Sequence, residues 1–282
     1  MRPNLKTAPG LLGDSPRKAY VTKLDLFNRF AEPELRRLLA DLGLAEDSHV
    51  LDAGCGTGLM TTWLADLAPA GLALGVDLST GHLRHARSRM PAHPSLQFLQ
   101  ADMTRLPLTV GPFDLIWSSN AINHLHDPVA GLKALAAKLR PGGRLVLGQS
   151  AFLPDMFFAW DARLEKEVML ACRQYYRDKY GLDERGTTAA RNLFGWMRRA
   201  GLKNVTAATI IIERTAPLSA EDRQYFVEGV FQGYWAHRVQ PYLTEADWRT
   251  LDALCDPASP QFCLNRPDFH HIQTYSTVMG WV

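Results

Sequence analysis

The stretch Val50 to Gly58, V-L-D-A-G-C-G-T-G, decides the fold of this chain. Two apolar residues lead into Asp52, and glycines follow at alternate positions, Gly54, Gly56 and Gly58. The next segment, Met60 to Leu67, is predicted to be helical. Because glycine lacks a Cβ and tolerates positive φ, such a loop lets its backbone approach another group closely. A strand, a glycine loop and a helix N-terminus in this order predict a nucleotide-type binding site.

Working outward, the region from His49 to Ser150 alternates short apolar runs with amphipathic stretches. The runs are H-V-L-D-A, L-A-L-G-V-D, L-Q-F-L-Q-A-D, F-D-L-I-W-S-S and G-R-L-V-L-G-Q-S. Helices are predicted between them over Met60–Leu67, Thr80–Met90 and Pro128–Leu139, the last ending at the R-P-G-G turn. Continuous apolar strands separated by helices predict a parallel sheet covered on both faces, an α/β doubly wound fold.

The flanking regions have helical periodicity broken by two further strands. Lys18 to Leu44 is predicted to be helical, with Pro33 dividing it in two. After Ser150, helices are predicted over residues 161–181, 188–200, 221–238 and 245–254. The β-branched run Val205–Glu213 and the segment His271–Val282 are predicted to be strands.

Composition narrows the class of protein. The chain has 282 residues and a net charge of +2, which gives no reason to expect a polyanionic partner such as nucleic acid. Its cysteines, Cys55, Cys172, Cys255 and Cys263, form no C-x-x-C pair, so we expect neither a metal site nor disulfides but free thiols in a reducing cytoplasm. No apolar signal core and no run near the roughly 18 apolar residues of a membrane span is present, so we expect a cytoplasmic protein.

Asp52 distinguishes between possible nucleotide ligands. The spacing is G-x-G-x-G and not the G-x-G-x-x-G of dinucleotide sites. A carboxylate at Asp52 would repel a pyrophosphate by on the order of a few kcal/mol at an effective dielectric constant of about 20. It would suit a cation, and S-adenosylmethionine carries a sulfonium and an ammonium but no phosphate. A nicotinamide dehydrogenase is therefore disfavoured. The alternative for Asp52 is that it caps the following helical turn.

The ends of the next strands carry further polar residues. Asp77 is placed to accept hydrogen bonds from two ribose hydroxyls, Asp102 to accept from an adenine amino group, and Met103 to pack on the ring. The fourth strand ends in S-S-N-A-I-N-H-L, Ser118 to Leu125, where ligands of such sheets bind. The alternatives are a strand-end surface residue for Asp77, a surface turn for Asp102, and a small loop filler for Cys55.

In these ordered motifs the chain resembles the class I S-adenosylmethionine-dependent methyltransferases, and within them the quinone-biosynthesis and natural-product enzymes. The resemblance covers about Leu44 to Ser150. It implies a seven-stranded Rossmann-like sheet, mainly parallel, with the two late strands as a final antiparallel pair. It also implies S-adenosylmethionine as cofactor and S-adenosylhomocysteine as product. The residues expected to bind the cofactor are Asp52, Gly54, Cys55, Gly56, Gly58, Asp77, Leu78, Ala101, Asp102, Met103, Ser119, Asn120 and Tyr20.

Methyl transfer from a sulfonium is an in-line displacement, so the protein mainly aligns the reactants and excludes water. A general base is needed only where the acceptor loses a proton, and His124 is the candidate. The alternative is a structural histidine bonded to backbone. His270 or His271 could also face the pocket. Tyr20, just before the first helix, could close over the cofactor or form a hydrophobic staple.

Two insertions rich in aromatic residues are expected to form a helical lid with an apolar pocket for the methyl acceptor. Their rings are Phe152, Phe157, Phe158, Trp160, Tyr175, Tyr176, Tyr180, Tyr225, Phe226, Phe231, Tyr234, Trp235 and Tyr242. Those expected to touch the acceptor, besides His124, are Phe152, Phe157, Trp160, Tyr176, Phe231 and Trp235. Such a pocket fits a flat hydrophobic molecule or an amine held by cation–π contacts. The alternative is that most rings pack the lid onto the sheet.

The expected organisation follows the chain. Residues 1–44 form an N-terminal helical segment closing over the cofactor, 45–150 the cofactor-binding core, and 151–186 a first helical lid insertion. Residues 187–214 supply a core helix and the sixth strand, 215–269 a second helical lid insertion, and 270–282 the last strand. The sequence predicts a small-molecule methyltransferase, a monomer or homodimer. The alternatives are a cofactor-binding enzyme or scaffold that does not methylate and, disfavoured by charge and by S-S-N-A, a nucleic-acid methyltransferase.

Overall fold

The computed structural model describes residues 18–89, 93–107, 109–150, 157–158, 160–181 and 190–282. Within them an eight-stranded sheet has the order β3-β2-β1-β4-β5-β8, with β7 on the outer edge of β8 and the short β6 farther along β8. The strands are β1 (His49–Ala53), β2 (Leu72–Asp77), β3 (Leu96–Gln100), β4 (Phe113–Ser119), β5 (Leu139–Ser150), β6 (Phe157–Phe158), β7 (Lys203–Thr215) and β8 (His270–Trp281).

The first five strands are parallel, and β8 runs antiparallel between β5 and β7. All seven predicted strands are therefore confirmed, including the final antiparallel pair, and the two-residue β6 is an addition. The fold is a class I Rossmann-like α/β fold, as predicted. The order of the parallel strands changes direction between β1 and β4, which places the carboxyl ends of these strands at the position where such sheets bind ligands.

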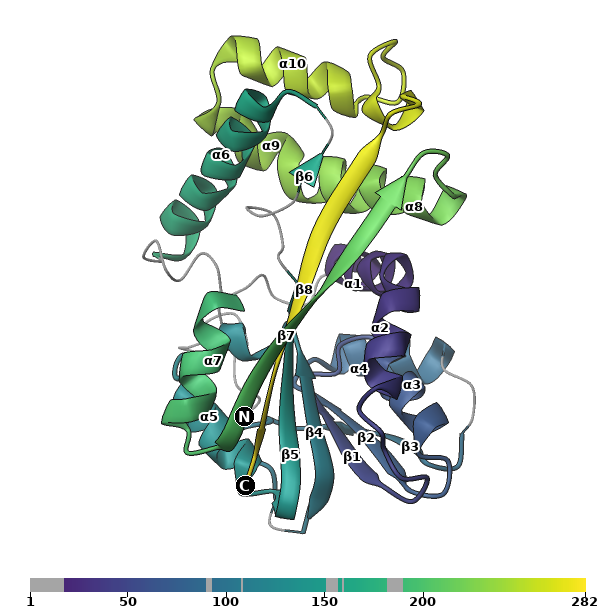
Figure 1. Cartoon of the computed structure of the whole chain (residues 1–282), viewed down its shortest axis with the longest axis vertical. Helices are drawn as coiled ribbons and strands as arrows, with labels where there is room; N and C mark the ends of the chain where they lie inside the picture. The colour runs from purple at the N-terminus through teal and green to yellow at the C-terminus, as the bar shows by residue number, and fades with distance from the viewer. Residues whose placement is uncertain (1–17, 90–92, 108, 151–156, 159, 182–189) are drawn as a thin grey trace.

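Helices cover both faces of this sheet (Figure 1). α1, α2, α3 and α4 lie on one side, and α5 and α7 lie on the other. The helices are α1 (Lys18–Phe30), α2 (Glu32–Ala40), α3 (Leu59–Leu67), α4 (Thr80–Arg89), α5 (Pro128–Ala136), α6 (Ala162–Tyr180), α7 (Ala190–Arg199), α8 (Ala220–Gln224), α9 (Ala236–Val239) and α10 (Glu245–Cys255). One-turn 3-10 helices are η1 (Ile122–His124), η3 (Gln240–Tyr242) and η4 (Cys263–Asn265).

Local sequence explains most helix boundaries. Pro33 divides the first helical region as predicted, because it occupies the first turn of α2, where its missing N–H costs no hydrogen bond. Asp161 caps α6 by accepting from the Leu164 N–H, and Gly181 ends the same helix in a left-handed conformation. Two predictions were wrong in detail. The helix after β4 ends at Ala136 rather than Leu139, and Tyr20 lies inside α1, which begins at Lys18 as predicted, rather than just before it.

The segment predicted to be helical over residues 221–238 is helical, but most of it is not an α-helix. After α8, the residues Tyr225–Trp235 form a π-helix, η2, before α9 begins. Such wide helices are rare, and they are frequently found at functional sites.

The strands β7 and β8 continue well beyond the parallel part of the sheet (Figure 1). The elements α6, β6, α8, η2, α9 and α10 gather around their far end, and we call this group the outer lobe. β5 pairs with β8 as far as Ser150 opposite Tyr275, so the outer lobe lies past the carboxyl ends of the parallel strands. One cluster of buried side chains joins the sheet, α1 and the outer lobe, with members such as Phe27, Trp117, Phe158 and Phe226. The outer lobe is thus packed onto the edge where the ligand is expected.

Candidate cofactor and acceptor site

The glycine loop after β1 is shaped by its own hydrogen bonds. Gly54, Gly56 and Gly58 all have positive φ, between 55° and 82°. The N–H groups of Gly54 and Cys55 both donate to the Val76 carbonyl at 2.8 and 3.0 Å, which ties the loop to the end of β2. The three glycines are therefore required by backbone conformation, before any ligand is considered.

Two of the three glycines also make room for protein atoms. A Cβ on Gly54 would lie 2.5 Å from the Cβ of Ala121, and one on Gly58 would lie 2.7 Å from the Phe98 ring. At Gly56 the nearest atom would be the Leu24 Cδ1 of α1, at 3.1 Å. From the sequence, all three glycines were interpreted as allowing a ligand to approach the backbone. The structure shows that Gly54 and Gly58 are needed because Ala121 and Phe98 pack against them. α1 lies directly over Gly56.

Asp77 is fixed at the end of β2 by backbone donors. Its Oδ2 accepts from the Gly56 N–H at 2.9 Å and its Oδ1 from the Ser79 N–H at 2.8 Å, while His82 Nδ1 lies 3.4 Å from Oδ1. Burial alone would raise the pKa of this carboxyl, but these hydrogen bonds and His82 hold the pKa below its ordinary value. A carboxylate has about four acceptor sites, so an ionised Asp77 can also accept from a ligand.

Asp52 lies in a different environment. It is 2% exposed, and its Oδ2 accepts from the Thr61 hydroxyl of α3 at 2.7 Å. Burial raises the pKa of Asp52 to about 7, against the bond from Thr61, and the Asp77 charge adds to the rise. The bond to Thr61 matches the alternative in which Asp52 braces the following helix, and the buried carboxyl is also suited to stabilise a bound cation.

The end of β3 lies beside Asp77. The Ala101 N–H donates to the Asp77 carbonyl at 3.2 Å, and the Leu78 carbonyl accepts from Gln100. Met103 reaches the glycine loop, with its sulfur 3.9 Å from the position of a Cβ on Gly54. Asp102 accepts from the Thr104 N–H at 2.8 Å, which is the local turn considered as its alternative role. Asp77 and Met103 therefore reach the glycine loop, whereas the hydrogen bonds of Leu78, Ala101 and Asp102 are made at the strand ends themselves.

The end of β4 is a small polar network. Ser119 Oγ is bonded to the Tyr275 hydroxyl at 2.7 Å. Asn120 has a positive φ of 50°, and its Oδ1 accepts from the Ser150 N–H at 2.9 Å. These bonds join β4, β5 and β8 at the carboxyl edge. Tyr275 was missed by sequence reasoning because only the sheet topology brings it beside Ser119.

His124 ends η1, immediately after this network. Its ring donates to the Asn120 carbonyl, and burial lowers the pKa of His124 despite that bond. The imidazole is therefore neutral near pH 7, as a proton acceptor must be. The bond to backbone is the alternative considered from the sequence, and both roles are compatible with this geometry.

Two further polar groups at the same edge lack partners. Within the part of the chain that the structure describes, Thr57 Oγ1 and Asn123 Oδ1 are buried and form no hydrogen bond. Thr57 belongs to the glycine loop and Asn123 precedes His124. Thr57 belongs to the motif V-L-D-A-G-C-G-T-G and Asn123 to S-S-N-A-I-N-H-L, but only the structure shows that these atoms are buried without a hydrogen bond.

The predicted acceptor residues are divided among several environments. Phe231 and Trp235 are 3% and 4% exposed, with ring centroids 5.5 Å apart, and pack inside the outer lobe. Trp160 is half-buried and stacks on Phe158 at 4.8 Å, and Tyr176 is half-buried on α6. Phe152 lies outside the described residues, as do the side chains of Phe157 and Tyr20. Of the two late histidines, His271 is buried in the outer lobe and His270 pairs with Glu213.

Cys55 is buried, and burial raises the pKa of its thiol, which agrees with a loop filler. Among the described residues, no group of three His, Cys, Asp or Glu side chains could hold a metal ion. Nor does any described helix have the length and apolar character needed to cross a bilayer.

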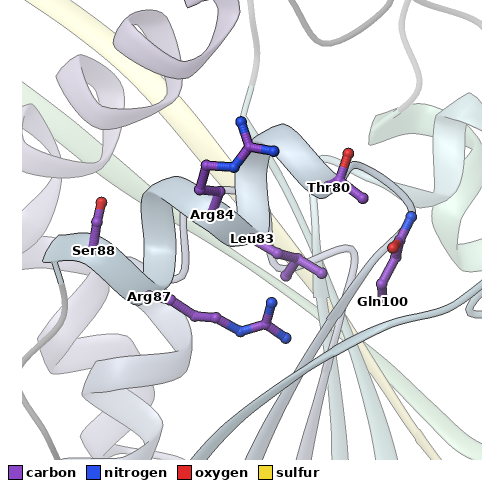
Figure 2. Close-up of a pocket in the computed structure, with 6 residues that line it drawn as sticks. All are labelled: Thr80, Leu83, Arg84, Arg87, Ser88 and Gln100. Atoms are coloured by element: carbon purple, nitrogen blue, oxygen red, sulfur yellow. The ribbon is translucent and has the colours of Figure 1, made fainter.

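A hollow lies along α4 and the end of β3 (Figure 2). It is lined by Thr80, Leu83, Arg84, Arg87, Ser88 and Gln100. None of these residues belongs to the predicted site.

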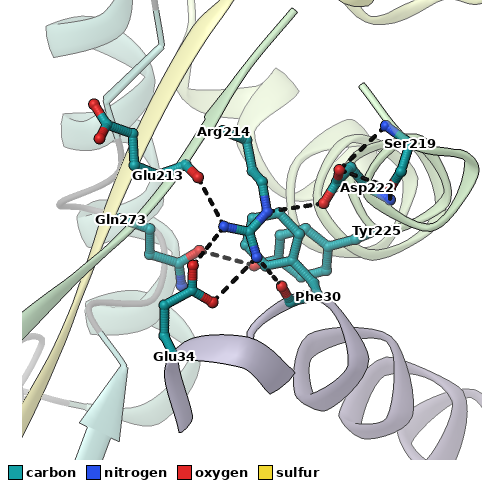
Figure 3. A network of polar contacts seen from close by, with 8 residues as sticks. All are labelled: Phe30, Glu34, Glu213, Arg214, Ser219, Asp222, Tyr225 and Gln273. Atoms are coloured by element: carbon teal, nitrogen blue, oxygen red, sulfur yellow. Dashed lines mark hydrogen bonds and ion pairs between the residues drawn. The ribbon is translucent and has the colours of Figure 1, made fainter. Parts of the chain in front are cut away.

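The N-terminal helices are held to the outer lobe by Arg214 at the end of β7 (Figure 3). Its guanidinium lies 2.7 Å from Glu34 of α2 and 2.9 Å from Asp222 of α8. It also donates to the Phe30 carbonyl and lies over the Phe30 ring at 4.6 Å. Burial alone would lower the pKa of Arg214, but Glu34 and Asp222 raise it. This cation thus fixes α1, and with it Leu24, above the glycine loop.

Comparisons with known proteins agree with this geometry. A sequence model described as "Methyltransferase domain" matches residues 50–143. The malonyl-[acyl-carrier protein] O-methyltransferase of Pseudescherichia vulneris is 35% identical over 61% of this chain and 62% of its own length. The demethylmenaquinone methyltransferase of Mycobacterium sp. (strain KMS) is 32% identical over 59% of this chain and 69% of its own. The first relative is therefore matched over less than two thirds of its length.

A solved structure shares the fold. A SAM dependent methyltransferase from Aquifex aeolicus superposes with a TM-score of 0.52 at 18% identity, covering 70% of this chain and 93% of that one. With these similarities and the site geometry, the chain belongs to the class I S-adenosylmethionine-dependent methyltransferases.

Proposed function

We propose that this protein transfers the methyl group of S-adenosylmethionine to a small hydrophobic or aromatic molecule. The observation that carries the proposal is the pair of carboxyl groups at the glycine loop. His82 and the N–H groups of Ser79 and Gly56 hold the pKa of Asp77 below its ordinary value against the effect of burial, and Asp52 is buried with a raised pKa. The first suits ribose hydroxyls and the second a cationic ligand.

The unsatisfied atoms at the same edge support the fit of the cofactor. Buried polar atoms normally find a partner, and Thr57 Oγ1 and Asn123 Oδ1 have none within the described chain. S-adenosylmethionine offers donors and acceptors in its amino, carboxylate, ribose and adenine groups. Gly54, Cys55 and Gly58 would shape the loop around the methionine part, and Leu78, Ala101, Asp102 and Met103 would surround the adenine.

The chain's residues then have defined tasks. When bound, the cofactor supplies a methyl group already activated by its sulfonium. Ser119 and Asn120, fixed by Tyr275 and Ser150, would flank the line of transfer and orient the acceptor. His124, neutral near pH 7, would take the proton of an acceptor that must lose one. The outer lobe and α1 would exclude water.

The acceptor class rests on the aromatic lining and on the relatives. The relatives are named for malonyl-[acyl-carrier protein] and for demethylmenaquinone, and neither is a nucleic acid. Trp160 and Tyr176 are half-buried at the outer lobe and would contact the acceptor, with Phe231 and Trp235 supporting them from behind.

Mass spectrometry of the product tests the proposed reaction. The protein is incubated with S-adenosylmethionine and a panel of phenols, catechols, hydroxyquinones and carboxylic acids, with RNA and DNA included. We expect one panel member among the small molecules to gain one methyl group, with an equal amount of S-adenosylhomocysteine released. A cofactor that binds but is never demethylated, or a product that carries no methyl group, would support a non-methylating enzyme or scaffold. Methylated RNA or DNA would contradict the small-molecule proposal.

His124 is tested by a pair of variants. His124→Ala is expected to lower kcat about 100-fold with unchanged affinity for S-adenosylhomocysteine, because a general base contributes rate and not cofactor binding. His124→Gln keeps a donor for the Asn120 carbonyl but cannot accept the proton, so it should lose the same rate. Wild-type kcat in the Gln variant would show that His124 only positions the backbone.

The raised pKa of Asp52 predicts two effects of pH. The native state keeps its Asp52 proton up to about pH 7, whereas the unfolded chain loses it near the ordinary value of 3.8. The free energy of unfolding should therefore fall as pH rises between these values and then level off. Because a bound cation favours the ionised form, cofactor binding near neutral pH should release part of a proton.

Calorimetry of cofactor binding in two buffers of different ionisation enthalpy measures how much of a proton is released. Asp52→Asn should abolish its release and flatten the fall of stability with pH. Equal proton release by the wild type and the Asn variant would show that Asp52 does not face the cation.

A further inference from the structure

One face of β8 carries a row of buried polar side chains. His271, Gln273 and Tyr275 are each 0% exposed and occupy alternate positions, so they lie on the same side of the strand. Tyr275 is level with Ser150 at the end of β5, whereas Gln273 and His271 lie opposite Ile212 and Phe158, beyond the sheet edge. The row therefore runs from the proposed methyl-transfer position into the outer lobe.

One buried donor atom in this row has no hydrogen-bond partner among the described residues. The Tyr275 hydroxyl is bonded to Ser119 at 2.7 Å, and Gln273 Oε1 accepts from the Tyr225 hydroxyl at 3.1 Å (Figure 3). Gln273 Nε2 is buried and has no hydrogen-bond partner among the described residues. A primary amide without an acceptor in an apolar interior is unfavourable, so this donor points to an acceptor oxygen that the described chain does not provide.

Aromatic rings surround the row. Phe27 stacks on Tyr275 with centroids 6.4 Å apart, and Phe30 stacks on Tyr225 at 4.0 Å. Tyr225 and Phe226 come from the π-helix η2, a rare geometry associated with functional sites. Arg214, which lies over the Phe30 ring, is already paired with Glu34 and Asp222. An amide donor among rings favours a neutral oxygen over a carboxylate, because burying a charge is costlier.

The spacing suits an acceptor of one or two rings. A strand rises about 3.3 Å per residue, so the Cα of Gln273 lies roughly 7 Å beyond that of Tyr275. The Tyr275 hydroxyl contacts Ser119, which is proposed to flank the transferred methyl group. A flat molecule with its methylated atom near Ser119 would carry a second oxygen at the depth of Gln273.

Resting on the proposed function, we infer that Gln273 is a specificity-determining residue that donates a hydrogen bond from Nε2 to a carbonyl oxygen of an aromatic methyl acceptor. Phe27 and Phe30 of α1 cover this face of β8, so the acceptor replaces part of that ring packing when it binds. Tyr225 holds the Gln273 oxygen and so directs the nitrogen toward the ligand.

A matched pair of probes tests this inference in the full-length protein saturated with S-adenosylhomocysteine. α-Tetralone is a bicyclic aryl ketone, and tetralin has the same skeleton without the oxygen. The wild type is expected to bind α-tetralone about tenfold more tightly than tetralin, since only the ketone accepts from the buried amide. In Gln273→Met, which is unbranched and cannot donate, the preference should vanish or reverse.

Tyr225→Phe is the matched control, because it breaks the bond between Tyr225 and Gln273 but leaves the Nε2 donor. It should retain part of the preference for the ketone, because the donor remains although Tyr225 no longer directs it. The side-chain amide NMR signal of Gln273, assigned by its loss in the Met variant, should move with α-tetralone and not with tetralin. A preference that survives in Gln273→Met, or a wild type that does not prefer the ketone, overturns the inference. A wild type that does not bind S-adenosylhomocysteine at all overturns the proposed function instead.

Discussion

Asp77→Ala is expected to weaken the binding of S-adenosylhomocysteine by about 100-fold or more, the largest effect of any single change at the site. The variant lacks the carboxylate that would accept hydrogen bonds from two ribose hydroxyls. Hydrogen bonds to an ionised group are stronger than those between neutral groups. The same change frees the Gly56 N–H that now donates to Asp77 at 2.9 Å, so the glycine loop also loses one of its hydrogen bonds to β2. Isothermal titration calorimetry measures the affinity.

Asp114→Ala is the matched control. Asp114 is also a carboxylate that accepts a backbone N–H, from His49 at 2.8 Å, but it lies at the amino end of β4 and so at the opposite edge of the sheet. Its removal should leave the affinity for S-adenosylhomocysteine within about twofold. Equal affinities of the two variants, whether both normal or both reduced, would contradict the assignment of Asp77 to the ribose.

Arg214→Met is expected to lower the melting temperature by about 10 °C, because removing one member of a largely buried ion network, whose side chains are 15–19% exposed, leaves its partners uncompensated. Glu34 and Asp222 would lose their shared cation, and the Phe30 carbonyl would lose a donor. Since Arg214 holds α1 over the glycine loop, cofactor affinity should fall as well. Differential scanning calorimetry and titration of S-adenosylhomocysteine measure the two effects.

Arg266→Met provides the comparison for Arg214. Arg266 pairs with Asp268 at 2.7 Å, but the two side chains are 38% and 66% exposed. A surface pair contributes little, so this variant should melt within about 2 °C of the wild type. If the melting temperature of Arg214→Met were as close to the wild-type value as that of Arg266→Met, the Arg214 network would not hold the N-terminal helices.

The parts of the fold predicted correctly from the sequence are those that depend on local pattern. The continuous apolar runs identified the parallel strands, the glycine spacing located the loop, and Pro33 marked the break between α1 and α2. The residues at the carboxyl ends of the strands were also predicted to lie close together, because parallel strands end at a common edge of the sheet. Asp77 and Met103 indeed reach the glycine loop, and Ala101 bonds to Asp77 beside it.

The missed features depend on contacts between residues distant in the sequence. Arg214 meets Glu34 across 180 positions, and Tyr275 meets Ser119 across 156. Gly54 and Gly58 were attributed to ligand approach because nothing local reveals Ala121 and Phe98 beside them. Polar residues alternating along a strand usually face water, so the burial of Gln273 gave no local signal.

A crystal structure of the protein with S-adenosylhomocysteine tests the central claim most directly. We predict that the ribose hydroxyls lie within hydrogen-bond distance of Asp77, that the methionine part lies along Gly54 to Gly58, and that the sulfur faces Ser119 and Asn120. S-adenosylhomocysteine bound elsewhere, for instance in the hollow along α4, or the absence of bound S-adenosylhomocysteine at saturating concentration, would contradict the account.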